Sequence, residues 1–194
     1  LNGGCRAVIH NDIPADQPLH LEAQLVEVDD DGRRAILTQR LETRLTDGTP
    51  LLTADLRVFV PLGGPKPKGP RKPKPAVPVD AREVAWLRFK PDDGFRFACL
   101  TGDFNPVHWI GPYAKAAGFG RTIQHGFGTL ARALEALNTQ AWAGDTHKLQ
   151  AVDVRFTRPV KLPAKVGVYT HGDQLFVGTG AGGAANLVGT FETH

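Results

Sequence analysis

Apolar and polar residues alternate between residues 19 and 60, largely with a period of two. The apolar positions form three runs, which are Leu19, Leu21, Ala23 and Leu25, then Ala35, Leu37, Leu41 and Leu45, then Leu52, Ala54, Leu56 and Val58. Alternation places every second side chain on one face of an extended strand. Asp-Gly pairs at residues 31–32 and 47–48 separate the runs, and such pairs tolerate the positive φ of tight hairpin turns. The pattern therefore predicts an antiparallel meander.

A different period follows in the second half of the chain. Apolar residues recur there at spacings of three and four, at Ile123, Phe127, Leu130, Leu134 and Leu137. This spacing predicts a helix from about Thr122 to Trp142 with one buried face. Strands are expected at 149–160, 165–170, 174–178 and 186–192, between Pro, Gly and Asp turns. The elements together predict an α+β fold.

Residues 61–80 have another composition, PLGGPKPKGPRKPKPAVPVD. Repeated proline removes backbone donors and disfavours helix, so we expect an extended linker between a domain of residues 1–60 and a domain of residues 81–194. The linker carries five cations, Lys66, Lys68, Arg71, Lys72 and Lys74, against a formal net charge of +3 for the whole chain. They are either simply solvated or attract an anionic partner. Without interleaved aromatic residues they do not predict nucleic-acid binding.

Composition narrows the class of protein. Among 194 residues, 41% are hydrophobic, enough for a substantial core, and no run approaches the length of a membrane span. No signal peptide is recognisable, so a cytoplasmic location is expected. The chain starts at Leu1 and has no methionine, so we expect an N-terminal portion to precede it. The absence of serine excludes serine-nucleophile hydrolysis. Cys5 and Cys99 are expected to be reduced thiols, with Cys99 buried.

The segment LTGDFNPVH, residues 100–108, places an acid, an amide and an imidazole within six positions. Gly and Pro predict a turn that can bring Asp103 and His108 to the same water molecule. Adding water to an activated alkene needs a base for the nucleophile and an acid for the α-carbon, and this pair can supply both. The alternative is a purely structural turn, in which Asp103 and Asn105 bond nearby amides and His108 only makes a structural hydrogen bond.

A second segment, GFGRTIQHGFG at residues 118–128, lies where the predicted helix begins. Free amides at a helix N-terminus can bind an oxygen that gains negative charge, such as a thioester carbonyl turning into an enolate. We expect His125 to be a structural hydrogen-bonding residue, although a direct chemical role stays open. The remaining histidines are scattered without metal-ligand spacing, so no zinc site is predicted.

GDFNPVH followed by PYAKAAGFGRTIQHGFGTLARAL resembles the signature of the MaoC-like, hydratase 2 family, GDxNPxH with a downstream helix containing His-Gly. The resemblance covers residues 100–134. It implies a hot-dog fold, often duplicated as a double hot dog, with the N-terminal copy here incomplete or degenerate. It also implies interconversion of trans-2-enoyl and (R)-3-hydroxyacyl thioesters of coenzyme A or acyl carrier protein. No metal or redox cofactor is implied, and a homodimer is favoured.

Within this resemblance, Asp103 and His108 match the catalytic pair, Asn105 the asparagine that helps hold the site, and Gly126 the backbone donor to the thioester carbonyl. Ile110 departs from the polar residue of many relatives, and Thr129 stands in for a helix serine. Two alternatives remain, a hot-dog acyl-CoA thioesterase and a non-catalytic acyl-thioester-binding subunit. The motif argues against the first, and the intact acid and imidazole against the second.

Overall fold

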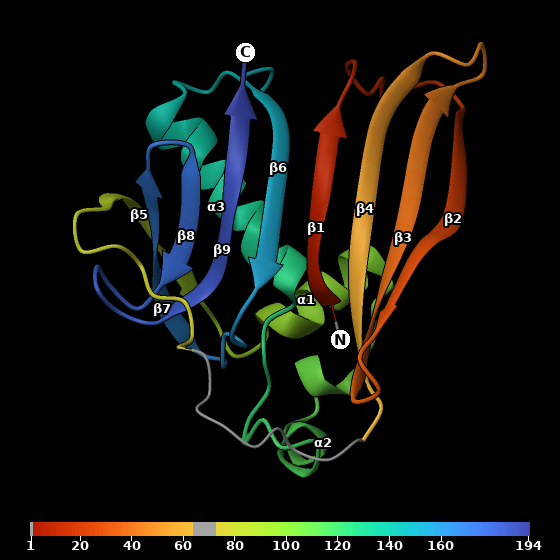
Figure 1. The fold of residues 1–194 in the computed structure, drawn as a ribbon. Helices are drawn as coiled ribbons and strands as arrows, with labels where there is room; N and C mark the ends of the chain where they lie inside the picture. Colours follow the sequence, from red (N-terminus) through yellow and green to blue (C-terminus); the bar gives the residue numbers. More distant parts are fainter. Residues whose placement is uncertain (1, 64–72) are drawn as a thin grey trace. The chain divides into compact units, whose positions relative to one another are not determined.

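The computed structural model describes residues 2–63 and 73–194 (Figure 1). Contacts between residues divide the chain into two compact units. The first unit comprises Leu1–Pro73, Thr146–Phe156 and Gly189–His194, and the second comprises Lys74–Asp145 and Thr157–Val188. The predicted domains, residues 1–60 and 81–194, stay a prediction, because units defined by contacts need not coincide with copies of a fold. Of the linker cations, only Lys74 lies among the described residues.

The first unit is built on antiparallel strands. They are β1 (Asn2–Ile9), β2 (Leu19–Asp30), β3 (Arg34–Leu45), β4 (Pro50–Pro61) and β6 (Leu149–Phe156), in the order β2-β3-β4-β1-β6. β2, β3 and β4 form the meander that the alternation predicts. Gly32 and Gly48 take φ values of 75° and 90° in its two turns, as Asp-Gly pairs allow. The described residues of this unit contain no helix.

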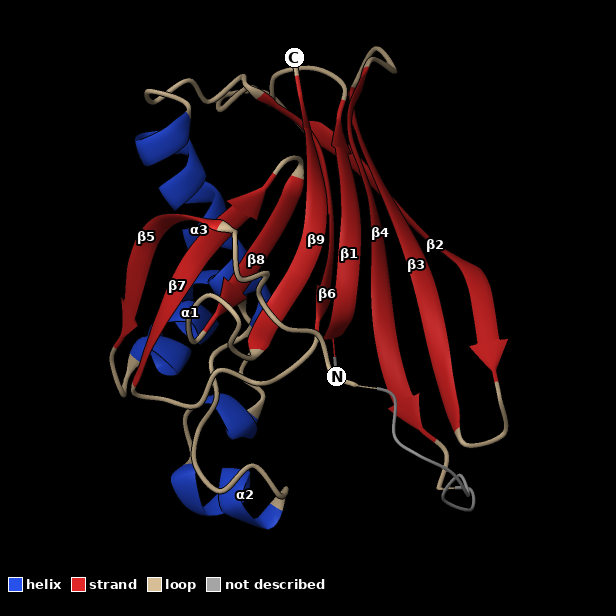
Figure 2. Cartoon of the chain, turned by 60° about the vertical axis from the view of Figure 1, so that its left-hand side comes forward, coloured by secondary structure: helices blue, strands red, loops and turns tan. Residues whose placement is uncertain are grey.

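The second unit carries all the helices of the described residues (Figure 2). Its elements are β5 (Arg82–Phe89), α1 (Asp93–Thr101), the 3₁₀ turn η1 (Pro106–His108), α2 (Gly111–Ala116), α3 (Gly126–Ala141), β7 (Ala164–His171), β8 (Gln174–Gly178) and the first residues of β9 (Ala185–Thr193). The strand order is β9-β8-β7-β5, and β7 runs antiparallel to both β8 and β5.

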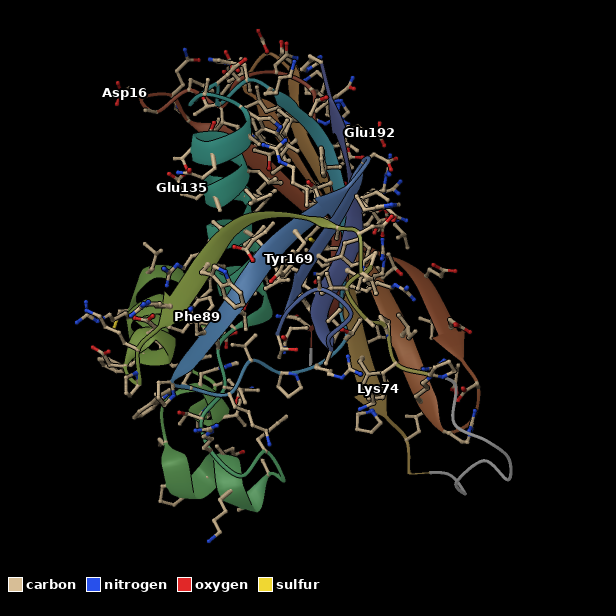
Figure 3. All side chains as sticks on the ribbon, turned by 90° about the vertical axis from the view of Figure 1, so that its left-hand side faces the viewer. Asp16, Lys74, Phe89, Glu135, Tyr169 and Glu192 are labelled. Carbon is tan, nitrogen blue, oxygen red and sulfur yellow. The ribbon has the colours of Figure 1, made fainter. Side chains whose placement is uncertain are left out.

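Helix α3 packs on β5, and Leu130 and Leu137 of the face that the periodicity indicates are buried. Arg132 reinforces this contact, because its guanidinium lies 4.7 Å from the ring centroid of Phe89 and its Nη1 donates to the Arg88 carbonyl at 2.7 Å. Figure 3 labels Phe89 on β5 and Glu135 on α3. A buried cluster of Val77, Tyr169, Phe176, Ala185 and Val188 forms another part of the core of this unit.

Two sequence predictions need correction. The helix begins at Gly126 rather than Thr122, because Ile123 forms a β-bridge with Lys161 and the Gln124 amide donates to the Val160 carbonyl. Cys99 is exposed, not buried, since α1 buries only its Gly94 and Ala98. Cys5 is a free, buried thiol on β1, and burial raises its pKa to about 11. Within the described residues, no helix has the length and apolarity needed to cross a membrane.

Candidate active site

Helix α1 ends directly before the candidate site. Gly102 follows the helix with φ 76°, and its amide donates to the Ala98 carbonyl at 2.8 Å. Glycine adopts this left-handed conformation without steric cost, so the helix stops and the chain turns sharply. The Thr101 hydroxyl donates back to the Phe97 carbonyl at 2.9 Å. Asp103 is thereby placed directly after a well-defined helix end.

The next residues form the predicted turn through side-chain bonds to backbone amides. Asp103 Oδ1 accepts from the Asn105 amide at 3.3 Å, and Asn105 Oδ1 caps η1 by accepting from the Val107 amide at 3.3 Å. The bonds of the purely structural alternative are thus present. They occupy only one carboxylate oxygen of Asp103, however, and the side chain is 45% exposed. A carboxylate oxygen therefore stays available for chemistry.

His108 is buried, and its Nδ1 lies 2.8 Å from the Ile123 carbonyl. A carbonyl only accepts, so Nδ1 carries the proton and Nε2 holds the lone pair. Helix α1 packs tightly behind it, since a Cβ at Gly94 would lie 2.1 Å from the His108 carbonyl oxygen. Burial lowers the pKa of His108 from its ordinary 6.5, although the bond to Ile123 opposes this shift. The ring is therefore an uncharged acceptor near neutral pH.

His125 lies against both of these residues. Its Nε2 is 3.0 Å from the Asp103 carbonyl oxygen and 3.7 Å from Asp103 Oδ2. Its ring stacks on that of His108 with centroids 3.5 Å apart and 21° between the planes. The site thus joins Asp103, His108 and His125, of which the sequence predicted the first two as a functional pair and expected the third to be structural. Its only sequence signal is the position directly before the predicted donor Gly126.

One ligating atom from each of these three side chains lies within 4.8 Å of the others. A water molecule with two partners about 2.8 Å away at a tetrahedral angle separates those partners by roughly 4.6 Å. A separation within 4.8 Å is thus compatible with one water molecule held between Asp103 and His108. All the residues of this arrangement belong to the second unit.

The same three side chains are poorly arranged for a metal ion. Imidazole binds a metal through a lone pair in the ring plane, at about 2.0–2.1 Å for zinc. The two histidine rings are nearly parallel and stacked, so their lone pairs do not converge on one point. The geometry argues against a shared ion, and the absence of a metal stays a prediction.

Helix α3 begins at Gly126, beside the candidate pair of Asp103 and His108. His125 is the N-cap residue but makes no side-chain capping bond, and its own amide donates to Gln124 Oε1 at 3.0 Å. Amides of the first helical turn have no partner within the helix, so the Gly126 N–H is available to an incoming oxygen. The Thr129 hydroxyl, considered as a stand-in for a serine, donates to the His125 carbonyl at 3.2 Å.

The lowered pKa values of the two stacked histidines predict a loss of stability on acidification. Burial is the main cause for both rings, and both pKa values lie below 6.5 in the folded protein. As pH falls through 6.5, the two histidines are protonated in the unfolded chain before they are protonated in the folded chain. The free energy of unfolding therefore decreases. We expect thermal denaturation to show a falling Tm between about pH 7 and pH 5. An unchanged Tm over this range would contradict the prediction, and exposed His171→Phe should preserve the decline as a control.

Comparison with known proteins identifies the family of the chain. Residues 64–174 match the family model of the MaoC like domain, which is more than half of the chain. The chain therefore belongs to the MaoC-like family, as the sequence motif predicted. It is 39% identical over 104 residues to a 3-hydroxyacyl-thioester dehydratase X of Mycobacterium tuberculosis, covering 54% of this chain and 34% of that protein. It is also 30% identical over 175 residues to a peroxisomal enoyl-CoA hydratase 2 of Arabidopsis thaliana, covering 82% and 56%.

Solved structures confirm the fold. HtdX from M. tuberculosis matches with a TM-score of 0.78 at 24% identity, covering 99% of this chain and 76% of that one. Another M. tuberculosis protein, described as having a double hotdog fold, matches with a TM-score of 0.65 at 13% identity, over 100% and 75%. The predicted α+β hot-dog fold is thus confirmed. The chain spans about a third of the length of the first of these curated relatives and little more than half of the length of the second.

Proposed function

We propose that this protein is a hydro-lyase that interconverts trans-2-enoyl and (R)-3-hydroxyacyl thioesters of coenzyme A or acyl carrier protein. The observation that carries the proposal is the placement of Asp103 and His108 within 4.8 Å of each other, beside the first turn of α3. Membership of a family with relatives named 3-hydroxyacyl-thioester dehydratase and enoyl-CoA hydratase supports it.

The chemistry follows from this arrangement. A carboxylate oxygen of Asp103 and the unprotonated Nε2 of His108 hold the water molecule, and one of them takes its proton as its oxygen bonds to the β-carbon. Electrons of the double bond move towards the thioester, whose oxygen gains negative charge and is stabilised by the Gly126 amide. A proton delivered by the pair to the α-carbon completes the addition. Asn105 holds the turn through its bond to Val107.

The decisive experiment separates hydration from thioester cleavage. Incubating the protein with crotonyl-CoA should remove the absorbance of the conjugated enoyl thioester without releasing a free thiol. Thiol release would instead support the alternative acyl-CoA thioesterase. No change in either signal would favour a non-catalytic acyl-thioester-binding subunit.

For the basic linker, we propose attraction of the anionic substrate carrier. Replacing Lys66, Lys68, Arg71, Lys72 and Lys74 with neutral residues removes five positive charges but no group of the candidate site. We expect a lower kcat/KM with a shallower dependence on salt, and an unchanged kcat at saturation. An unaltered salt dependence would leave the five cations as simply solvated charges.

We also propose that the protein is a cytoplasmic homodimer. The apolar side chains of β2 support self-association, because Leu21 is 67% exposed, Leu25 56% and Val28 55%. Light scattering during size exclusion should give twice the mass of the chain, and Leu21→Lys with Leu25→Lys should shift the protein towards monomer. A parent protein that is monomeric at micromolar concentration would contradict the proposal.

A further inference from the structure

His125 is the buried group at the site that the proposed chemistry does not use. Its side chain is 3% exposed, and it contacts both members of the pair that holds the water. Phe97 of α1 packs on the same ring, with centroids 4.9 Å apart. The titratable groups that face it are Asp103 and His108, and Phe97 and Gln124 add no charge. Its state therefore bears directly on the pair.

The hydrogen bonds determine which nitrogen of His125 carries the proton. The Asp103 carbonyl oxygen can only accept, so the His125 Nε2 at 3.0 Å must donate. Nδ1 then holds the lone pair of a neutral ring. This Nδ1 is buried and has no hydrogen-bond partner among the described residues. A charged ring would need an acceptor there for a second N–H, and leaving a buried donor of a cation unpaired is costly.

The stacking on His108 excludes a second charge as well. With ring centroids 3.5 Å apart, protonation of both rings would place two cations in contact inside the protein. His108 is the ring whose free Nε2 reaches the water and so receives its proton when it acts as the base. A neutral His125 leaves that proton transfer unopposed.

We propose that His125 is a positioning residue with a neutral imidazole protonated at Nε2. Its Nε2–H holds the Asp103 backbone carbonyl, and its ring covers one face of the His108 ring and keeps water off that face. The inference rests on the proposed function and deepens it. One ring then does two separable things. Its hydrogen bond sets the direction of the Asp103 carboxylate, and its stacked face sets the environment of the His108 imidazole.

Two substitutions divide these contributions. His125→Phe keeps an aromatic face against His108 but loses the donor to Asp103, whereas His125→Gln keeps a donor near the position of Nε2 but loses the ring. For His125→Phe we expect kcat to fall by about 10-fold to 10²-fold with KM within a few-fold, because orientation is lost and binding is not. The acid limb of its pH profile should stay where it is in the parent.

For His125→Gln the expected result is the reverse pattern. The donor is partly restored, so kcat should recover towards the parent at high pH. Water now reaches the His108 face, its pKa rises towards the ordinary value, and the acid limb of kcat should move to higher pH. His171→Phe, an exposed histidine on β7 of the same unit, is the matched control and should leave kcat and its pH profile unchanged.

A purely structural His125 would lower Tm in both variants but would leave kcat per folded molecule and the acid limb as in the parent, and that outcome would overturn the inference. The parent protein supplies an independent measurement. In ¹⁵N-histidine spectra, His125, assigned from its sequential neighbours, should show protonated Nε2 and unprotonated Nδ1 over the whole active pH range. The opposite tautomer, or a charged ring at active pH, also overturns it. A parent without hydration activity would refute the proposed function instead, a distinguishable result.

Discussion

Replacing Asp103 by asparagine or His108 by glutamine is expected to lower kcat for enoyl-thioester hydration at least about 10²-fold, because a positioned acid or base contributes about 10² to 10⁴ in rate. Asparagine cannot take or deliver the proton that the carboxylate moves. Glutamine at position 108 has no titratable nitrogen to replace His108 Nε2. The measurement is the initial rate with crotonyl-CoA and a longer enoyl-CoA, together with circular dichroism to show that each variant is folded.

Non-additivity tests whether the two residues act on the same water molecule. If they do, removing one partner already abolishes the productive arrangement, and the double variant should be scarcely slower than the worse single variant. Asp173→Asn, an exposed aspartate on the turn between β7 and β8, is the matched control and should retain the parent rate. Either single variant, folded yet within a few-fold of the parent, would show that the site is assigned wrongly.

Replacing Gly126 by proline is expected to lower kcat by about 10² to 10³, the usual effect of losing one donor to a developing oxyanion. The substitution removes the backbone N–H and places the proline Cδ where its hydrogen stood. Gly126 is the first residue of α3, where proline is well tolerated since that amide has no partner within the helix. His125 precedes it with φ −59° and ψ 140°, the extended conformation that a residue before proline prefers.

Gly126→Ala is the matched control, because alanine keeps the N–H, whereas proline loses this donor and adds its Cδ at the same position. The ratio of kcat between the alanine and proline variants is therefore an upper limit on the contribution of the amide. KM should change less than kcat, since the oxygen carries more negative charge in the transition state than in the bound substrate. Equal rates for the two variants would remove Gly126 from the proposed mechanism.

Much of the fold follows from local spacing. Alternation over residues 19–60 determines β2, β3 and β4, and spacings of three and four determine the buried face of α3. These patterns succeed because a strand and a helix each repeat their exposure to the core with a fixed period. Strand β1 shows no such pattern and was not among the elements predicted from the sequence. It is specified by its neighbours, since it pairs with both β4 and β6.

The candidate pair was also accessible from the sequence, because Asp103, Asn105 and His108 lie within one short turn whose bonds are local. Only the tertiary structure decided where α3 begins, since Ile123 matches the helical spacing, yet Ile123 and Gln124 pair with the chain near residue 160. It also decided the place of His125. Its bond to the Asp103 carbonyl joins residues 22 positions apart, and no local period reports a contact of that range. Burial, tautomer and stacking are properties of the packed site, so they exist only once α1, η1 and the start of α3 have come together.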